Sequence, residues 1–109
     1  MAPVLKIRYY VSEDGTKPFE AFIRRLKTRE ERAECMTWIE FLRQRGDMLD
    51  GHQHRTPVLG LCEIRDRSMR IFYLRDGDAI VIIDGLLPNQ GKEFFEEICR
   101  KAEDYVSDD

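Results

Sequence analysis

At 109 residues the chain is long enough to bury a core without disulfide cross-links, and we expect a single domain spanning residues 1–109. Hydrophobic residues make up 42% of the sequence and charged residues 36%, which is typical of a globular protein with a charged surface. No apolar run approaches the ~20 residues that span a bilayer, and the N-terminal residues lack the ~7–15-residue apolar core of a secretory signal. We therefore expect a cytoplasmic protein with no membrane partner.

The acidic charge is concentrated at the C-terminal end. The net charge of the chain is −3, but residues 93–109 contain two basic and seven acidic residues and therefore carry −5. The other 92 residues contain 16 basic and 14 acidic residues and carry +2. A basic groove can therefore form locally in a protein that is acidic as a whole.

The three cysteines, Cys35, Cys62 and Cys99, are odd in number and lack CxxC spacing. This argues against a disulfide framework and against a zinc site. Each lies among apolar residues, so we expect small buried side chains in a reducing compartment.

The N-terminal part of the chain predicts one strand and one helix. Residues 4–11 are β-branched and aromatic with partial alternation, which indicates a strand with one apolar face. Residues 12–15 form a turn in which Gly15 can adopt a positive φ. The helix that follows has Pro18 in its first turn, where the missing amide costs little. Its apolar stripe is Phe19, Phe22, Ile23 and Leu26.

A second helix is predicted almost immediately. Thr28 and Glu31 have the spacing of a capping box, and Gly46 is a candidate C-cap. The apolar positions of this helix share one face and are Cys35, Trp38, Ile39 and Leu42. Because the break between the helices is so short, we expect a helical hairpin packed against the first strand.

The second half of the chain changes to a period of two. Residues 47–59 are predicted to form a polar loop, and strands follow at 60–65, 69–75 and 79–83. Asp76-Gly77-Asp78 is a hairpin turn, and the continuous apolar run at 79–83 indicates the most buried strand. After Asn89-Gln90-Gly91 a final helix has an apolar side made of Phe95, Ile98, Cys99, Ala102 and Tyr105. The order β-α-α-β-β-β-α predicts an α+β fold, an antiparallel sheet packed by the N-terminal helical hairpin and a C-terminal helix.

Three consecutive segments carry a resemblance to a known family: GLCEIR at 60–65, RIFY at 70–73 and DGDAIVIIDGL at 76–86. With the order and length of the helices, they resemble the RelE/ParE toxin superfamily, in its phage-derived, HigB-like branch of host-inhibition toxins. The resemblance covers nearly the whole chain and implies a RelE-like fold. It also implies the toxin of a type II toxin–antitoxin system, usually a metal-independent, ribosome-dependent mRNA endoribonuclease. The implied partners are an antitoxin, typically a helix-turn-helix protein, and the ribosome with its mRNA.

A second hypothesis remains open. The HigB-like pattern commonly has lysines after the last strand, whereas residues 86–92 read LLPNQGK, with one lysine at the end. Some members of the superfamily inhibit DNA gyrase, so the fold alone does not fix the target. The alternative is a non-catalytic protein with the toxin fold, which binds an antitoxin or phage partner or inhibits a gyrase-type host enzyme.

Metal-free RNA cleavage by the neighbouring 2′-hydroxyl needs a base, cations around the phosphate and an acid for the leaving oxygen. Arg65 and Arg70 are the best candidates for the cations, because guanidinium groups grip phosphate oxygens in pairs. Arg65 is out of phase with apolar Cys62 and Ile64, while Arg70 alternates with Ile71. The alternative interpretation is that both arginines form structural or surface ion pairs, for example with Glu63 or Asp84.

The remaining candidates are less specific. Tyr73 could orient the phosphate, although its phase with Ile71 favours the core. His54 is a candidate acid–base residue, and His52 a substrate contact; their unperturbed pKa near ~6.5 suits proton transfer. The H-x-H pair lacks an obvious third ligand, so we predict no metal and no cofactor. Predicted phosphate contacts, with solvated surface as the alternative, are Arg55, Lys92 and Arg75.

Overall fold

A computed structural model describes residues 4–45, 52–53 and 60–107. In chain order its elements are β1 (Lys6–Tyr9), α1 (Pro18–Arg25), α2 (Arg29–Arg45), β2 (His52–Gln53), β3 (Cys62–Arg65), β4 (Arg70–Asp76), β5 (Ala79–Leu86) and α3 (Lys92–Ser107). Every predicted element is present in the predicted order, so the α+β class is confirmed.

The sheet contains five strands in the order β1-β5-β4-β3-β2. Strands β2 to β5 pair antiparallel, as predicted, but β1 pairs parallel with β5, from Lys6 opposite Ala79 to Tyr9 opposite Ile82. The parallel pairing of β1 is therefore the one departure from the predicted antiparallel sheet. A parallel pair needs a long crossover connection, and α1, α2 and the meander together supply it. Alternation along a strand reveals its faces but not its neighbours.

The segment predicted as a polar loop, residues 47–59, also contains a strand. In β2, His52 and Gln53 pair with Glu63 and Cys62 of β3. Two residues are too few for a periodic pattern, so this edge strand could not be predicted from the sequence. The predicted C-cap Gly46 lies outside the described residues, as does the rest of this segment.

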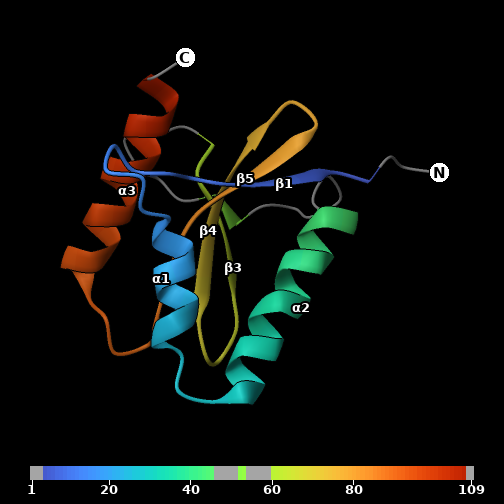
Figure 1. Ribbon diagram of the computed structural model, residues 1–109, viewed down its shortest axis with the longest axis vertical. Coiled ribbons are helices and arrows are strands. Elements are labelled where there is room, and N and C mark those ends of the chain that lie inside the picture. Colours follow the sequence, from blue (N-terminus) through green and yellow to red (C-terminus); the bar gives the residue numbers. More distant parts are fainter. Residues whose placement is uncertain (1–3, 46–51, 54–59, 108–109) are drawn as a thin grey trace.

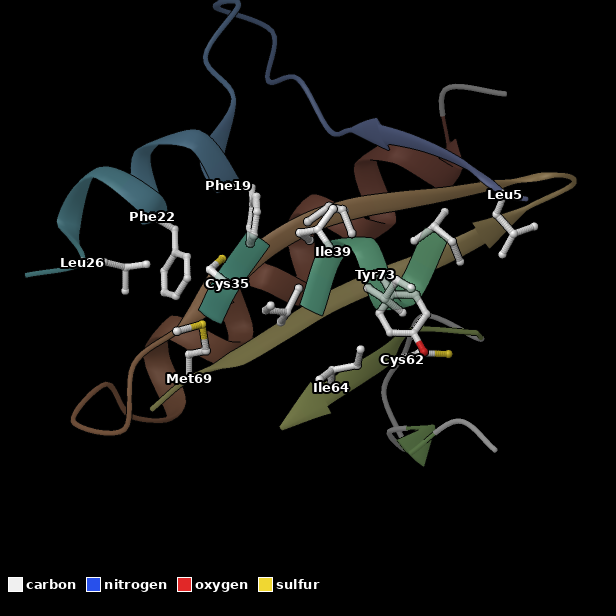
Figure 2. Close-up of a cluster of buried hydrophobic side chains, with 14 residues drawn as sticks. Leu5, Phe19, Phe22, Leu26, Cys35, Ile39, Cys62, Ile64, Met69 and Tyr73 are labelled. Carbon is white, nitrogen blue, oxygen red and sulfur yellow. The ribbon is translucent and has the colours of Figure 1, made fainter. Parts of the chain in front are cut away.

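The helices α1 and α2 cover one face of the sheet (Figure 1). Figure 2 shows Phe19 and Phe22 of α1 and Cys35 of α2 pointing into a cluster with side chains of the sheet, among them Ile64 and Tyr73. The capping box of α2 forms as predicted. The Glu31 amide donates to Thr28 Oγ1 at 3.0 Å, and the Thr28 amide donates to Glu31 Oε1 at 3.1 Å. This cap allows α2 to start with only three residues between it and the end of α1.

The helix α3 covers the opposite face. Its buried side chains Ile98, Cys99 and Ala102 pack on a second cluster, whose sheet members are Leu61, Phe72, Leu74, Val81, Ile83 and Leu86. Two polar contacts also fix the helix: Tyr10 donates to Asp104 Oδ2 at 2.6 Å, and Lys101 Nζ lies 2.6 Å from Asp84 Oδ2. The sheet is therefore the middle layer of three.

Strand β5 is buried along its entire length, which confirms the prediction from its apolar run and extends the strand to Leu86. A β-bulge lies opposite Phe72 and Tyr73. Before the bulge Ile80 and Ile82 face the helical hairpin; after it Gly85 lies against the Phe22 ring. Asp84 contacts Lys101 of α3. The bulge thus changes the alternation of β5 partway along the strand.

The three cysteines are free and buried, as predicted. Burial, followed by the charge of Asp66, raises the pKa of Cys35 to about 12, so this thiol stays protonated at neutral pH. Among the described helices, none is long and apolar enough to cross a membrane.

The close packing of Phe22 on Gly85 predicts a strong effect of adding one methyl group. In Gly85→Ala the new Cβ would overlap the Phe22 ring, 2.6 Å from its Cζ. We expect a loss of about 1–3 kcal/mol in the free energy of unfolding, measured by urea denaturation.

The control is a double-mutant cycle with Phe22→Leu, which removes ring atoms from the site of overlap. Gly85→Ala should lower the free energy of unfolding much less in the Phe22→Leu background than in the wild type. Equal costs in both backgrounds would show that Phe22 does not exclude a side chain at position 85.

Candidate functional site

Arg65 and Arg70 are directly opposite each other in the ladder between β3 and β4. Two like charges in this relation repel and destabilise a strand pair unless an opposite charge lies near them. Glu63 supplies this opposite charge. It is two residues before Arg65, and residues two apart in a strand lie on the same face. The Glu63-Ile64-Arg65 spacing thus places a carboxylate beside both arginines.

The Glu63 carboxylate binds one arginine with each oxygen. Arg65 Nη2 donates to Oε1 at 2.8 Å, and Arg70 Nε donates to Oε2 at 2.6 Å. The Glu63 side chain is only 3% exposed, whereas those of Arg65 and Arg70 are 61% and 27% exposed. The carboxylate therefore lies below two guanidinium groups that reach towards solvent. An arginine has five N–H donors, so these contacts leave donors on both for a further ligand.

Arg70 also lies over two aromatic rings. Its Cζ atom is 5.0 Å from the centroid of Phe72 on β4 and 5.6 Å from that of Phe95 on α3. The two rings are themselves 5.5 Å apart. Cation–π attraction and the Glu63 contact together fix the guanidinium at the junction of the sheet and α3.

The turn between β3 and β4 adds a third arginine. Asp66 Oδ1 accepts hydrogen bonds from the amides of Ser68 at 2.7 Å and Met69 at 2.9 Å, the pattern of an Asx turn. This turn contains Arg67, whose side chain is exposed. Arg67 follows Arg65 and precedes Arg70 in the sequence, and it lines the same hollow as both of them.

Helix α2 braces the same turn. Trp38 Nε1 donates to Asp66 Oδ2 at 2.6 Å. Burial by itself raises the pKa of Asp66, but hydrogen bonds with Glu34, with Trp38 and with the turn amides outweigh it and leave the pKa below its ordinary value. The hydrogen bond with Asp66, and then the charge of Asp66, raise the pKa of Glu34. The carboxylate of Asp66 is therefore engaged in the turn.

The three arginines line one hollow of about 240 Å³. Its wall consists of Arg65, Asp66, Arg67, Met69, Arg70 and Pro88. Three cations and one engaged carboxylate make this hollow basic in a chain whose net charge is −3. Such a site can bind phosphate oxygens through several N–H donors at once.

The sequence reasoning found Arg65 and Arg70 but missed Arg67 and its supports. The signal that could have found Arg67 was the Asp66-Arg67-Ser68 triplet, because aspartate two residues before serine is typical of an Asx turn. Trp38 was recognised only as an apolar position, so its hydrogen bond to Asp66 was not expected.

Tyr73 lies on the opposite face of the sheet from these arginines. Its side chain is 3% exposed and belongs to the cluster under α1 and α2 (Figure 2). Burial, followed by the neighbouring Cys62 thiol, raises the pKa of Tyr73 to about 12. The structure thus places Tyr73 in the core, away from the hollow that contains Arg65 and Arg70.

The other predicted residues are dispersed. The backbone of His52 is opposite Glu63 in the ladder between β2 and β3, while His54 and Arg55 lie outside the described residues. Lys92 is the first residue of α3, and its side chain is 86% exposed. Its Nζ atom lies 3.9 Å from Oε1 of Glu96. Arg75 is exposed at the far end of β4, where its Nε donates to the Gly77 carbonyl.

A larger hollow of about 480 Å³ lies between α1 and α3. The Asp84–Lys101 pair lines it, but none of the predicted site residues whose side chains the structure describes does. We place the candidate site at the smaller hollow because the cations converge there. Within the described residues, no cluster of three histidine, cysteine or acidic side chains could hold a metal ion.

Comparison with known proteins supports the fold. A chain of the crystal structure of the toxin–antitoxin complex RelBE2 from Mycobacterium tuberculosis is similar, with a TM-score of 0.61 and 17% identity. The match covers 78% of this chain and 99% of that chain. No protein-family model matches the sequence, and no curated protein matches it significantly. The similarity therefore shows a RelE-like fold.

The Glu63 contacts predict unequal effects of removing the two arginines. Arg70→Gln removes a hydrogen bond to a buried carboxylate and should lower the free energy of unfolding by about 1.5–3 kcal/mol. Arg65→Gln removes a contact of a largely exposed side chain and should cost less than about 1 kcal/mol. Urea denaturation of the two variants measures the difference.

Glu63→Gln serves as the second member of a cycle with Arg70→Gln. If Arg70 acts through the carboxylate, the cost of Arg70→Gln should shrink in the Glu63→Gln background. If Arg70→Gln and Arg65→Gln, each made in the otherwise wild-type protein, lowered the free energy of unfolding equally, the greater contribution of Arg70 to stability would be contradicted.

Proposed function

We propose that this protein is the toxin of a type II toxin–antitoxin system, a HigB-like, phage-derived, metal-independent endoribonuclease that cuts mRNA on the ribosome. The observation that carries the proposal is the basic hollow formed by Arg65, Arg67 and Arg70 on a RelE-like sheet. Such an enzyme acts in the cytoplasm as the single domain 1–109 and needs no cofactor.

The chemistry of the hollow suits cleavage by a neighbouring 2′-hydroxyl. The 2′ oxygen forms a bond to phosphorus while the bond from phosphorus to the 5′ oxygen breaks. Negative charge grows on the phosphate oxygens during this step, and fixed guanidinium groups stabilise it. We assign that role to Arg65 and Arg67, whose donors face solvent, and to Arg70, which Glu63 and the aromatic rings hold in place.

Proton transfer falls to the histidine pair in this proposal. A base must accept the 2′ proton, and an acid must protonate the leaving 5′ oxygen. We assign the base to His52, because its backbone pairs with that of Glu63, two residues before Arg65. His54 is the second candidate. Arg55, Lys92 and Arg75 remain candidate phosphate contacts outside the hollow, and Tyr73 is assigned to packing.

The proposed protein partner is an antitoxin of the helix-turn-helix type. It is supported by the similar fold of a chain from a toxin–antitoxin complex and by the sequence resemblance. A reading frame for a small helix-turn-helix protein next to this one would support the pairing further.

A second candidate function is a non-catalytic inhibitor with the same fold, which binds a gyrase-type host enzyme or a phage partner. One observation favours it: Glu63 neutralises part of the positive charge of the hollow. The segment after β5 contributes only one lysine, Lys92, which already lies beside Glu96.

Toxicity of an arginine variant distinguishes the two functions. Arg65→Gln/Arg67→Gln removes two cations from the hollow but leaves the Arg70–Glu63 contact in place. With purified translating ribosomes, we expect mRNA cleavage to slow by at least about 10²–10³-fold, and expression in bacteria to lose its effect on growth. Primer extension on the mRNA and growth curves measure these effects.

The matched control is Arg24→Gln/Arg29→Gln, which removes the same charge from two exposed arginines that do not line the hollow and should remain fully toxic. Arg70 is a poor residue for this test because its removal also destabilises the fold. A folded double variant that cuts no mRNA yet still stops growth would support the inhibitor instead. A wild type that affects neither growth nor mRNA would refute the nuclease.

The histidine assignment predicts a pH-dependent rate. If His52 is the base with an unperturbed pKa near ~6.5, the wild-type cleavage rate should fall as the pH drops below that value. His52→Gln should lower the rate by about 10²–10⁴-fold at neutral pH and abolish this dependence.

His54→Gln is the natural comparison, because it makes the same substitution at the other histidine, two positions away. If His54→Gln alone slows the reaction, the base is His54 rather than His52. If neither variant slows it, proton transfer does not use this pair.

A further inference from the structure

A second hollow adjoins the one that contains the arginines. Its volume is about 320 Å³, and its wall includes Arg25, Lys27, Ser68, Pro88 and Asn89. Pro88 lines both hollows, so they meet at this residue. The elements that contribute are the connection from α1 to α2, the turn between β3 and β4, and the segment between β5 and α3. These three connections lie at the same end of the molecule (Figure 1).

The charges of the second hollow resemble those of the first. Arg25 and Lys27 are exposed, and within the described residues neither forms an ion pair with a carboxylate. The acidic side chain of this wall, Glu31, already accepts hydrogen bonds from the amide and hydroxyl of Thr28 in the capping box. The two hollows are lined by five cations and by two engaged carboxylates, and the carboxylate of Glu63 lies below them as a third, so the cations remain in excess.

Arg25 is also anchored to the rigid part of the fold. Its Cζ atom lies 5.9 Å from the centroid of the Phe22 ring, and that ring is fully buried against Gly85. A cation attached to the core in this way loses less conformational entropy on binding an anion than one on a free loop.

We propose that single-stranded RNA runs from the arginine hollow across Pro88 into the second hollow, where Arg25 and Lys27 bind the next phosphates of the strand. The inference rests on the proposed nuclease function and adds to it a binding track for the substrate beyond the site of cleavage. A strand presents regularly spaced phosphates, and two adjoining basic hollows fit two successive parts of it. The exposed Pro88 ring provides an apolar surface between them on which a base or ribose can pack.

The test compares two lengths of 2′-O-methyl RNA, which lacks the attacking hydroxyl and is not cleaved by this chemistry. An oligonucleotide of about three residues should fill one hollow, whereas one of about ten should reach both. The full-length protein binds each labelled oligonucleotide in a salt titration, followed by fluorescence anisotropy. The wild type should bind the longer strand more tightly and with a steeper dependence on salt.

The test variant is Arg25→Gln/Lys27→Gln. It should lower the slope of log K against log salt for the longer strand by about 1.4, that is about 0.7 for each lost phosphate contact. Binding of the short strand should change little. The control Arg24→Gln/Arg29→Gln removes the same charge from neighbouring positions that line neither hollow, and it should bind both strands like the wild type.

Each other outcome overturns the track. Unchanged binding by the test variant, with weaker binding by Arg65→Gln/Arg67→Gln, would refute the track and leave the nuclease proposal intact. Equal weakening by the test and control variants would reveal long-range attraction without a track. A wild type that binds neither strand would refute the track and the RNA-binding part of the proposed function together.

Discussion

The burial of β5 on both of its faces is the constraint on which the other features depend. An interior strand that carries eight buried residues in succession must be covered by a layer of helix on each side. The chain meets this requirement with the α1–α2 hairpin on one face and α3 on the other. The two faces thereby acquire different chemistry. The hairpin face is almost wholly apolar, whereas the α3 face retains charged groups where the helix stops covering the sheet.

These charged groups depend on one buried carboxylate. Without Glu63, Arg65 and Arg70 would be opposed like charges at the edge of an apolar cluster. With it, they form a compact group whose outward donors remain available. The Glu63 carboxylate also neutralises part of the positive charge of the site. Arg67 restores this charge from a turn that Asp66 and Trp38 hold in place.

Much of this arrangement could be predicted from the sequence, for identifiable reasons. Periodicity and capping signals located the helices. The phase of Arg65 against Cys62 and Ile64 predicted that it points away from the face on which they pack, and the phase of Tyr73 with Ile71 favoured the core. That Arg65 and Arg70 share one face follows only from the pairing of β3 with β4. The parallel pairing of β1 with β5 could not be predicted, because alternation carries no information about neighbours. The turn that holds Arg67 is braced by a hydrogen bond between Trp38 and Asp66, 28 positions apart, which no local pattern encodes.

The bulge in β5 has a consequence for how divergent relatives of this chain should be aligned. Ile83 is the residue that the bulge adds to β5, so deleting it would restore regular alternation without exchanging the faces. Asp84 would still face Lys101, and Gly85 would still lie against Phe22. An alignment of relatives should therefore allow a gap of one residue at Ile83. At an identity of 17%, a gap placed at the bulge gives a firmer register than matching letters.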